Sequence, residues 1–409
     1  MLPTPFDPWT KDETFTEYLV RQGLSRRQFL KFCGKVALLL GGGALLSSHD
    51  KKAFAKEIAE RLNSAKRPTV VWLQLQECTG CLESALRSGD RTLEDLVLSI
   101  ISLDYNELLM APSGDQANAA LEKASAGPHL LVVNGSIPTK EKGAYCVIGG
   151  ESAEGLLIKA SRSATAVVAI GACAHYGCIQ AAAPNPTGAV GVSSIVRDRP
   201  VINLSGCPPI GEVITATLLY YVIYGHAPHV DQDGRPLFAY GQRIHDKCPR
   251  RAHYDAGQFV LQFDDENARK GYCLYKVGCK GPATFAPCAI MEWNQGCSFP
   301  IKSGHPCLGC TERHFFDRMT PFYRRLPGLE VPGTGVELTT NQIGGLAVAA
   351  SVAGVAVHSA ATVIRRQQTH KGRPPRPSPL PFWETKRPES RQIKRNQSRP
   401  DPACHHETS

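Results

Sequence analysis

The stretch "RPTVVWLQLQECTGC", residues 67–81, decides the fold. Its apolar, β-branched run reads as a buried strand, and Cys78 and Cys81 follow directly. The pattern returns in "TAVVAIGAC", which ends at Cys173, and in "RPVINLSGC", which ends at Cys207. A fourth run, "HLLVVNGSIP", has no nearby cysteine. Short strands that alternate with helical stretches such as "SAEGLLIKASRS" predict an α/β fold with a parallel sheet.

The four cysteines are expected to meet at one edge of this sheet. Ligands of open parallel sheets bind beyond the carboxyl ends of the strands. After Cys207, "PPIGEVITATLLYYVIYG" predicts a helix with a proline in its first turn, whose dipole would favour a thiolate or an anionic cluster. A C-x-x-C pair alone would fit zinc or a redox dithiol as well. Four cysteines from distant strand ends, beside glycines that leave room, fit an iron–sulfur cube better.

The second half of the chain has a different character. From Tyr240 to about Arg325 the sequence has few apolar periods, and an inorganic cluster would supply the core that such a domain lacks. His245 precedes Cys248 by three residues, a spacing that favours a metal ligand over an ordinary surface histidine. The cysteines of this region are Cys248, Cys273, Cys279, Cys288, Cys297, Cys307 and Cys310.

Positive charge is concentrated at the two ends of the chain. The chain has 409 residues and is long enough for two domains. The net charge is +9, of which residues 365–409 carry +7 and residues 1–55 carry +3. The remaining 309 residues are therefore at −1. A nearly neutral body lacks the electrostatic footprint of a nucleic-acid-binding protein, so that class is excluded.

The N-terminus resembles a twin-arginine export signal. Arg26 and Arg27 precede a short apolar run, and Ala53 and Ala55 give an A-x-A cleavage pattern, so residues 1–55 are predicted to be removed. A basic amphipathic helix is the alternative. Because this route exports folded proteins, it favours a cofactor inserted before export over a disulfide scaffold, which a chain of this size does not need.

A 22-residue stretch without charge, residues 343–364, has the length of one membrane crossing. Arg365 and Arg366 follow it and predict a cytoplasmic C-terminal side. A buried soluble helix is the alternative, since glycine and alanine dilute the hydrophobicity. Residues 367–409 contain eight prolines and few apolar side chains, and disorder is expected there.

Together these motifs resemble the small subunit of membrane-bound, periplasm-facing uptake [NiFe]-hydrogenases. The resemblance covers nearly the whole chain. It rests on "ECTGC", "GSIPTK", "NPTGAV", "GCPP", "FAYG", "HDKC", "GYCLYKVGCKGP" and "SGHPCLGC", several of which are long and rare.

The resemblance implies a flavodoxin-like N-terminal domain and three clusters. A proximal [4Fe–4S] cluster would be held by Cys78, Cys81, Cys173 and Cys207. A distal [4Fe–4S] cluster would be held by His245, Cys248, Cys273 and Cys279. A medial [3Fe–4S] cluster would be held by Cys288, Cys307 and Cys310, with Pro300 standing where a fourth ligand could approach and Cys297 as its rival.

The implied function is an electron relay. A separate large subunit would hold the Ni–Fe site that splits dihydrogen, and electrons would leave for a membrane acceptor, expected to be a b-type cytochrome. No catalytic residue is assigned to this chain, and a dimer of heterodimers on the periplasmic side of the inner membrane is expected. The implied boundaries are 1–55 signal peptide, 56–239 flavodoxin-like domain, 240–330 iron–sulfur domain, 331–342 linker, 343–364 anchor and 365–409 basic cytoplasmic tail.

Two departures from related sequences concern the proximal site and its surroundings. Oxygen-tolerant relatives carry two extra cysteines, at positions that correspond here to Gly80 and Cys178. With only the second present, we expect an ordinary four-cysteine cube and no oxygen tolerance by that mechanism. Asn134 stands where many relatives have glutamate.

Three other classes compete with the relay. A disulfide-rich binding protein explains neither the export signal nor the strand-end cysteines. A zinc-stabilised interaction protein is permitted by C-x-x-C alone. A related quinone-reductase subunit of respiratory complexes would share the proximal site but would lack the cysteines of residues 245–310.

Overall fold

The computed structural model of the protein describes residues 56–57, 60–61, 68–88, 101–325, 329–331, 336–338 and 340–371. The predicted signal peptide and most of the predicted tail lie outside these residues. The chain divides into two units, Met1–Pro327 and Gly328–Ser409.

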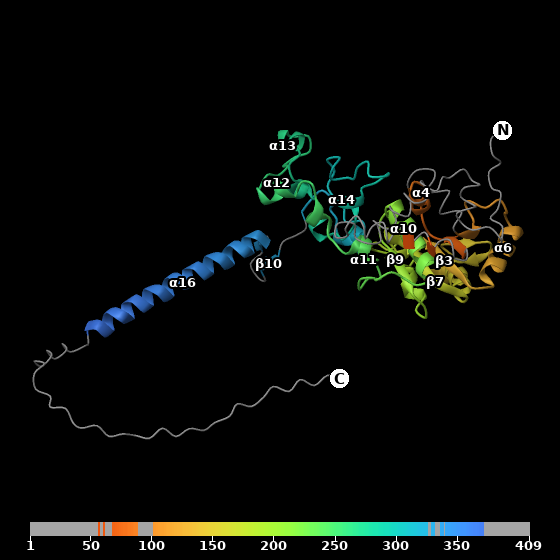
Figure 1. The fold of residues 1–409 in the computed structure, drawn as a ribbon, viewed down its shortest axis with the longest axis horizontal. Coiled ribbons are helices and arrows are strands. Elements are labelled where there is room, and N and C mark those ends of the chain that lie inside the picture. Colours follow the sequence, from red (N-terminus) through yellow and green to blue (C-terminus); the bar gives the residue numbers. More distant parts are fainter. Residues whose placement is uncertain are drawn as a thin grey trace, which may run out of the picture. The chain divides into compact units, whose positions relative to one another are not determined.

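The centre of the first unit is a five-stranded sheet in which every strand is parallel to its neighbours (Figure 1). Its order is β2-β1-β3-β7-β9. The strands are β1 Thr69–Gln74, β2 Ser102–Asn106, β3 His129–Asn134, β7 Ala164–Ile170 and β9 Val201–Leu204. The parallel α/β fold is thus confirmed, with all four predicted strands present. The sequence reading missed β2, a short edge strand in which polar and apolar residues alternate.

Helices connect these strands: α4 Gly80–Leu86, α6 Asp115–Ser125, α7 Ala153–Ser161, α8 Gly171–Tyr176, α9 Val192–Ile195 and α10 Gly211–Tyr224. The predicted helix in "SAEGLLIKASRS" is α7, and the Ser152 side chain caps it by accepting a hydrogen bond from the Gly155 N–H. The prediction of a proline in the first turn of α10 was wrong. Both prolines precede the helix, because a residue before proline is kept extended and Pro209 imposes this on Pro208.

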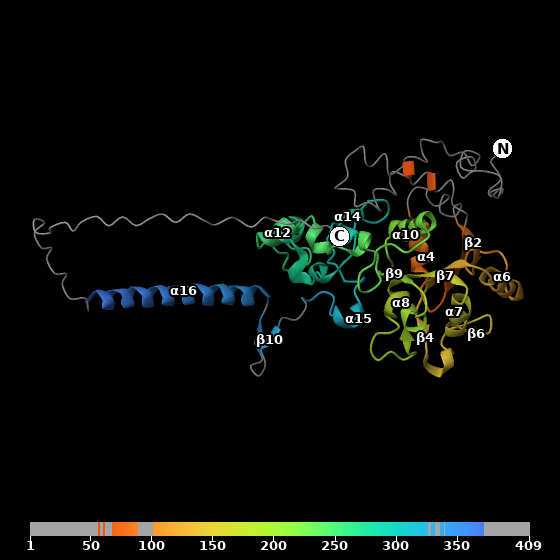
Figure 2. The same cartoon turned by 60° about the horizontal axis from the view of Figure 1, so that its bottom comes forward.

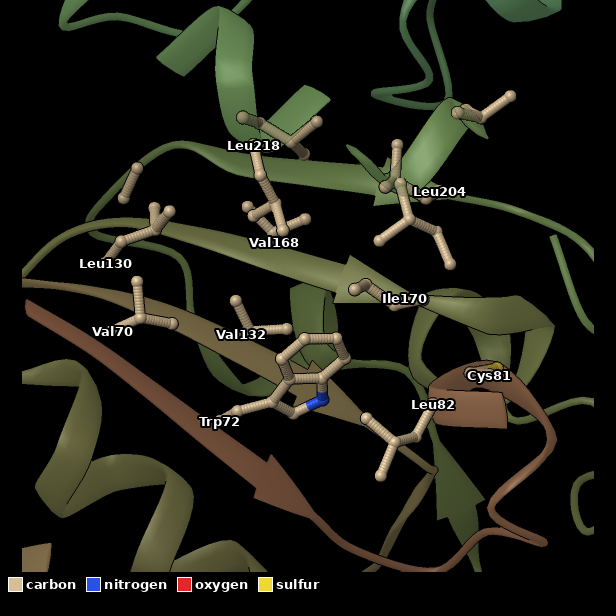
Figure 3. Close-up of a cluster of buried hydrophobic side chains, with 14 of the residues drawn as sticks. Val70, Trp72, Cys81, Leu82, Leu130, Val132, Val168, Ile170, Leu204 and Leu218 are labelled. Atoms are coloured by element: carbon tan, nitrogen blue, oxygen red, sulfur yellow. The ribbon is translucent and has the colours of Figure 1, made fainter. Parts of the chain in front are cut away.

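Side chains of the strands alternate between two apolar cores, one on each face of the sheet. Val70, Trp72 and Val132 point to the face covered by α4 and α10, where Leu82 and Leu218 meet them (Figure 3). Alternate residues of the same strands pack on the other face against α6 and α7. Figure 2 shows α4 and α10 on one side of the sheet and α7 and α8 on the other. Burial on both faces explains why the central strands are continuous apolar runs.

Beyond residue 236 the first unit has short helices and turns, as the sequence predicted. The elements are α11 Leu237–Tyr240, η2 Ile244–Lys247, α12 Arg251–Asp255, α13 Glu266–Arg269, η3 Leu274–Val277, η4 Gly281–Ala283, α14 Cys288–Met291 and α15 Phe315–Arg318. Its small core combines Ile244, Val260, Leu274, Phe299 and Ile301 with candidate ligands such as Cys307. The cysteines are therefore part of the core rather than additions to its surface.

The remaining short elements of the first unit are η1 Lys140–Gly143 and the two-residue strands β4 Ile137–Pro138, β5 Val147–Ile148, β6 Glu151–Ser152 and β8 Ala189–Val190. Strand β4 pairs with β8, and β5 pairs with β6, both antiparallel.

The second unit consists of an antiparallel pair, β10 Leu329–Val331 and β11 Val336–Leu338, and the helix α16 Thr340–Lys371. Strand β11 falls within the predicted linker. Within the described residues, Gly345–Arg366 is the one helical stretch long and apolar enough to cross a membrane, with a mean hydropathy of 1.8. It overlaps the predicted anchor, and α16 continues past Arg365 and Arg366 to Lys371.

Candidate functional site

Cys78, Cys81, Cys173 and Cys207 follow strands β1, β7 and β9 at one edge of the sheet. The Ala172 N–H donates to the Gly206 carbonyl at 2.7 Å and joins the ends of β7 and β9. Burial raises the pKa of the Cys81 thiol well above its usual range, and the neighbouring groups Cys173, Glu77, Cys207 and Cys78 raise it further. The four predicted proximal residues therefore lie close enough to influence one another.

Gly171, at the turn between β7 and α8, leaves room for Cys81. Its φ of +94° is one that side chains rarely adopt, and a Cβ atom there would stand 2.4 Å from the Cys81 sulfur. At Gly80 a Cβ atom would stand 3.3 Å from the Cys78 sulfur. Glycines thus keep space open around two of the four thiols, as a bulky cluster requires.

A fifth cysteine, Cys178, is buried beside this group, with 3% of its surface exposed. Its single S–H lies close enough to Cys173 and Cys207 to lower the pKa of Cys173 and to lower that of Cys207 to about 7. The same contacts raise the pKa of Cys178. The Cys173 thiol itself donates to the Gln180 side chain at 3.3 Å. Cys178 therefore favours the thiolate form of a neighbour, a contact that the sequence did not reveal.

The four predicted distal residues line one small pocket. His245, Cys248, Cys273 and Cys279 surround it together with Leu274, Tyr275 and Ile301. Burial raises the pKa of all three thiols, that of Cys273 to about 11. The His245 ring packs edge-on against Tyr254, with 4.6 Å between the ring centres. Burial of the imidazole lowers its pKa, which favours the neutral form that binds metals.

Of the three predicted medial residues, Cys307 is buried and the other two are half-buried. Burial raises the pKa of Cys288 to about 12, of Cys310 to about 11 and of Cys307 well above its usual range. The Gly309 N–H lies 3.4 Å from the Cys307 sulfur, and the Trp293 indole N–H donates to Cys288. Such N–H donors are the contacts by which proteins adjust cluster potentials.

Direct contacts join the three groups in series. The Ser205 hydroxyl, two residues before Cys207, donates to the carbonyl of Thr311, next to Cys310, at 2.7 Å, which connects the predicted proximal and medial residues. Lys280, next to Cys279, donates its N–H to the Cys307 carbonyl at 2.8 Å and connects the medial and distal residues. The medial group therefore lies between the other two.

Residues outside the three predicted sets also have defined places. Cys297 is exposed, whereas Cys146 is half-buried. Pro300 is exposed between the buried side chains of Phe299 and Ile301. Asn134 ends β3, fully buried, and its amide donates to the Gln74 side chain at 3.0 Å.

The donor set fits iron–sulfur clusters. All thirteen cysteines within the described residues are free thiols, and soft thiolates are the ligands that such clusters use. Ionising several buried thiols costs free energy that bound iron would offset, so metal binding and thiolate formation are coupled. No three His, Cys, Asp or Glu side chains in the described part of the chain could hold one metal ion. A cluster differs from a single ion because each thiolate binds a separate iron.

A cavity of about 600 Å³ lies elsewhere in the first unit and contains no cysteine. Its lining includes His175, Asn185, Asn203, Asp233 and Arg313. His175 is 4% exposed, and its Nδ1 lies 3.2 Å from the Ser205 hydroxyl, which donates to the Thr311 carbonyl. The cavity is therefore separate from the predicted cluster sites, and nothing in the sequence pointed to it.

Two family models match the two halves of the first unit. Residues 78–221 match the 20 kDa subunit of NADH ubiquinone oxidoreductase. Residues 240–323 match the C-terminal domain of NiFe/NiFeSe hydrogenase small subunits. The first match covers the predicted proximal residues and the second covers all the predicted medial and distal ones.

Curated relatives are similar over most of the chain. The uptake hydrogenase small subunit of Azotobacter vinelandii is 46% identical over 365 residues, which are 88% of this chain and 99% of that protein. The hydrogenase-1 small chain of Escherichia coli K12 is 44% identical over 366 residues, 89% of this chain and 95% of that one.

Solved structures agree with this similarity. A chain of the reduced, active Ni-Fe-Se hydrogenase of Desulfomicrobium baculatum matches with a TM-score of 0.60 and 33% identity, covering 64% of this chain and all of that chain. A chain of the actinobacterial-type NiFe-hydrogenase of Ralstonia eutropha H16 matches with a TM-score of 0.58 and 26% identity, covering 79% of this chain and 97% of that one.

Proposed function

Because the chain belongs to the family of uptake hydrogenase small subunits, we propose that it carries electrons through three iron–sulfur clusters to an acceptor in the membrane. It is a subunit of a hydrogenase, and its family implies a large subunit as partner and a role in electron transfer. The number and type of the clusters and the nature of the acceptor are the proposed parts. The single observation that supports them best is that three groups of thiols lie in series, joined by main-chain and hydroxyl contacts.

The proposed ligands are those expected from the sequence. The proximal [4Fe–4S] cluster takes Cys78, Cys81, Cys173 and Cys207; the distal [4Fe–4S] cluster takes His245, Cys248, Cys273 and Cys279; the medial [3Fe–4S] cluster takes Cys288, Cys307 and Cys310.

When bound, each cluster supplies one-electron redox chemistry, and the chain's own residues set where and how easily this occurs. The strand ends of β1, β7 and β9 fix the proximal thiols, and Gly171 keeps the space beside Cys81 open. The core of Ile244, Leu274, Phe299 and Ile301 excludes water from the medial and distal thiols. At the distal site, the neutral imidazole of His245 in place of a thiolate makes the ligand set less negative, which favours the reduced state.

The partner and the acceptor are proposed from the family. A large subunit holds the Ni–Fe site at which dihydrogen is oxidised, and electrons enter this chain at the proximal cluster. They leave from the distal cluster to a b-type cytochrome, within a dimer of heterodimers. A chain that only shared the proximal site with quinone reductases would not match the hydrogenase family over residues 240–323.

The finer features of fold and location belong to the same proposal. The strand order β2-β1-β3-β7-β9 supports a flavodoxin-like sheet in the domain of residues 56–239. The apolar stretch Gly345–Arg366 supports a single anchor in the inner membrane, with the clusters on the periplasmic side. Export by the twin-arginine route rests on residues 1–55 of the sequence.

Iron and acid-labile sulfide in the purified heterodimer test the proposal, together with EPR of the air-oxidised and the dihydrogen-reduced protein. We expect about eleven irons per small subunit, apart from the iron beside nickel, and a 3Fe signal in the oxidised sample. About twelve irons would mean that a fourth residue, Cys297 first, completes the medial cluster. Zinc, or no metal, would contradict the relay.

A further inference from the structure

Lys280 is the one lysine within the described residues that is almost completely buried, with 1% of its surface exposed. Burying an ammonium group is costly unless charge or hydrogen bonds compensate for the lost water. Its side chain Nζ donates to two main-chain carbonyls, those of Pro321, at 3.3 Å, and of Arg324. Hydrogen bonds thus replace water, but carbonyl oxygens carry no net charge.

The titratable groups that act on Lys280 are two thiols that would be anionic only when ionised or bound to iron. Burial lowers the pKa of Lys280, and Cys279 and Cys307 oppose this effect. Among the described residues, no carboxylate forms an ion pair with Lys280. The positive charge of Lys280 is therefore available to stabilise negative charge on the neighbouring cysteines.

The main chain fixes Lys280 between two of the proposed cluster sites. It follows Cys279 of the distal set, and its N–H donates to the carbonyl of Cys307 of the medial set. Its own carbonyl accepts from the Thr284 hydroxyl at 2.7 Å, and that hydroxyl lies 3.8 Å from the Cys307 sulfur. These contacts hold the main chain of Lys280 beside both sites, and the bonds to the Pro321 and Arg324 carbonyls fix its ammonium.

Building on the proposed function, we propose that Lys280 is a fixed buried cation which raises the reduction potentials of both the medial and the distal cluster. Each cluster gains one negative charge when it accepts an electron, and a nearby positive charge stabilises that state. Because the ammonium is shielded from water and salt, its effect is far larger than that of a surface lysine. None of the residues that contact or act on Lys280 belongs to the proximal set.

EPR-monitored redox titration of the purified heterodimer tests this role in Lys280→Met, with Lys276→Met as the matched control. Lys276 lies close to the distal set in sequence, three residues from both Cys273 and Cys279. Unlike Lys280, it is exposed, and its ammonium lies over the Phe259 ring. We expect Lys280→Met to lower the midpoint potentials of the medial and distal clusters together and to leave the proximal one unchanged. The control should shift them less, and its shift should shrink at high salt.

A second variant separates charge from structure. Lys280→Arg keeps the positive charge, so its two potentials should stay nearer to those of the wild type than those of Lys280→Met. If Lys280→Met loses a cluster, the titration should be repeated with Lys280→Gln, which keeps an N–H donor but not the charge. We expect Lys280→Gln to lower the same two midpoint potentials. If Lys280 has only a structural role, Lys280→Met should lower the thermal stability of the heterodimer while its midpoint potentials match those of Lys276→Met. That result would contradict the proposed role.

Iron content in the same preparations keeps the two proposals apart. Wild-type protein without clusters would contradict the proposed function. Wild-type protein with about eleven irons, whose potentials do not respond to Lys280→Met or Lys280→Gln, would contradict only the role of Lys280.

Discussion

Replacing Gly171 by alanine should damage the proximal site selectively. The new Cβ atom would stand 2.4 Å from the Cys81 sulfur, and the carbonyl of Gly206 lies 3.7 Å from the same point. The sulfur must therefore move, because no Cβ contact is that short in a relaxed structure. Since Cys81 is a proposed ligand, this movement should lower the iron content of the proximal cluster.

The magnitude follows from two terms. Alanine at a φ of +94° costs about 1–2 kcal/mol, as for other residues forced into left-handed conformations. Overpacking against the sulfur adds about 1–3 kcal/mol. Gly171→Ala should therefore destabilise the folded chain by about 2–5 kcal/mol.

Gly225→Ala is the matched control. Gly225 also has a positive φ, +70°, but a Cβ atom there would meet nothing within 4 Å. Thermal unfolding, iron content and the proximal EPR signal of the two variants should be compared in the purified heterodimer. If Gly171→Ala kept its full iron content and lost no more stability than Gly225→Ala, the argument that Gly171 makes room for Cys81 would be refuted.

Three further variants test neighbouring features. Cys178→Ala should keep all four proximal irons, because the proposed ligand set does not include Cys178, and a missing iron would show that it is a ligand. Cys297→Ser should leave the iron content and the 3Fe signal unchanged, because the proposed medial set does not include Cys297; a loss of either would show that it is a medial ligand. For Glu107, burial raises the carboxyl pKa from 4.5 to about 7. Between pH 4.5 and about 7 the folded state therefore keeps a proton on Glu107 that the unfolded state has lost. The free energy of unfolding falls by up to about 3 kcal/mol as the pH rises through this range. Glu107→Gln should remove this fall and unfold at a higher temperature than the wild type at pH 8, and an unchanged pH profile would speak against it.

The sequence predicted the sheet well because its central strands are buried on both faces and are followed by cysteines. It missed β2, whose five residues lie at the edge of the sheet and include the exposed Asp104. It also began α10 too early, since a proline after Cys207 was read as part of a first turn. In the structure, the extended residue Ile210 precedes the helix, which starts at Gly211.

The candidate sites were also predicted only in part. Cysteine spacing and family resemblance named the three sets of proposed ligands, and the structure brings each set together. Neither source could reveal Lys280, because a lysine beside a cysteine usually reaches solvent and only the fold shows that this one does not. The contact of Cys178 with Cys173 and Cys207 was equally hidden, since Cys178 lies in the turn after α8 and only the fold brings it beside them.

The contact between Cys207 and Cys310 also bears on how the protein is made. Cys207, the last of the proposed proximal ligands, is synthesised about a hundred residues before Cys310. On the ribosome, all four proposed proximal ligands are therefore made before the segment that contacts Cys207. The Ser205 hydroxyl and the Thr311 carbonyl, 2.7 Å apart, join the same two segments. We therefore expect that the emerging chain keeps its proximal thiols open to a cluster donor until the C-terminal segment docks. The order of synthesis would then give maturation enzymes a period in which they can insert iron. This period would end when the chain is complete.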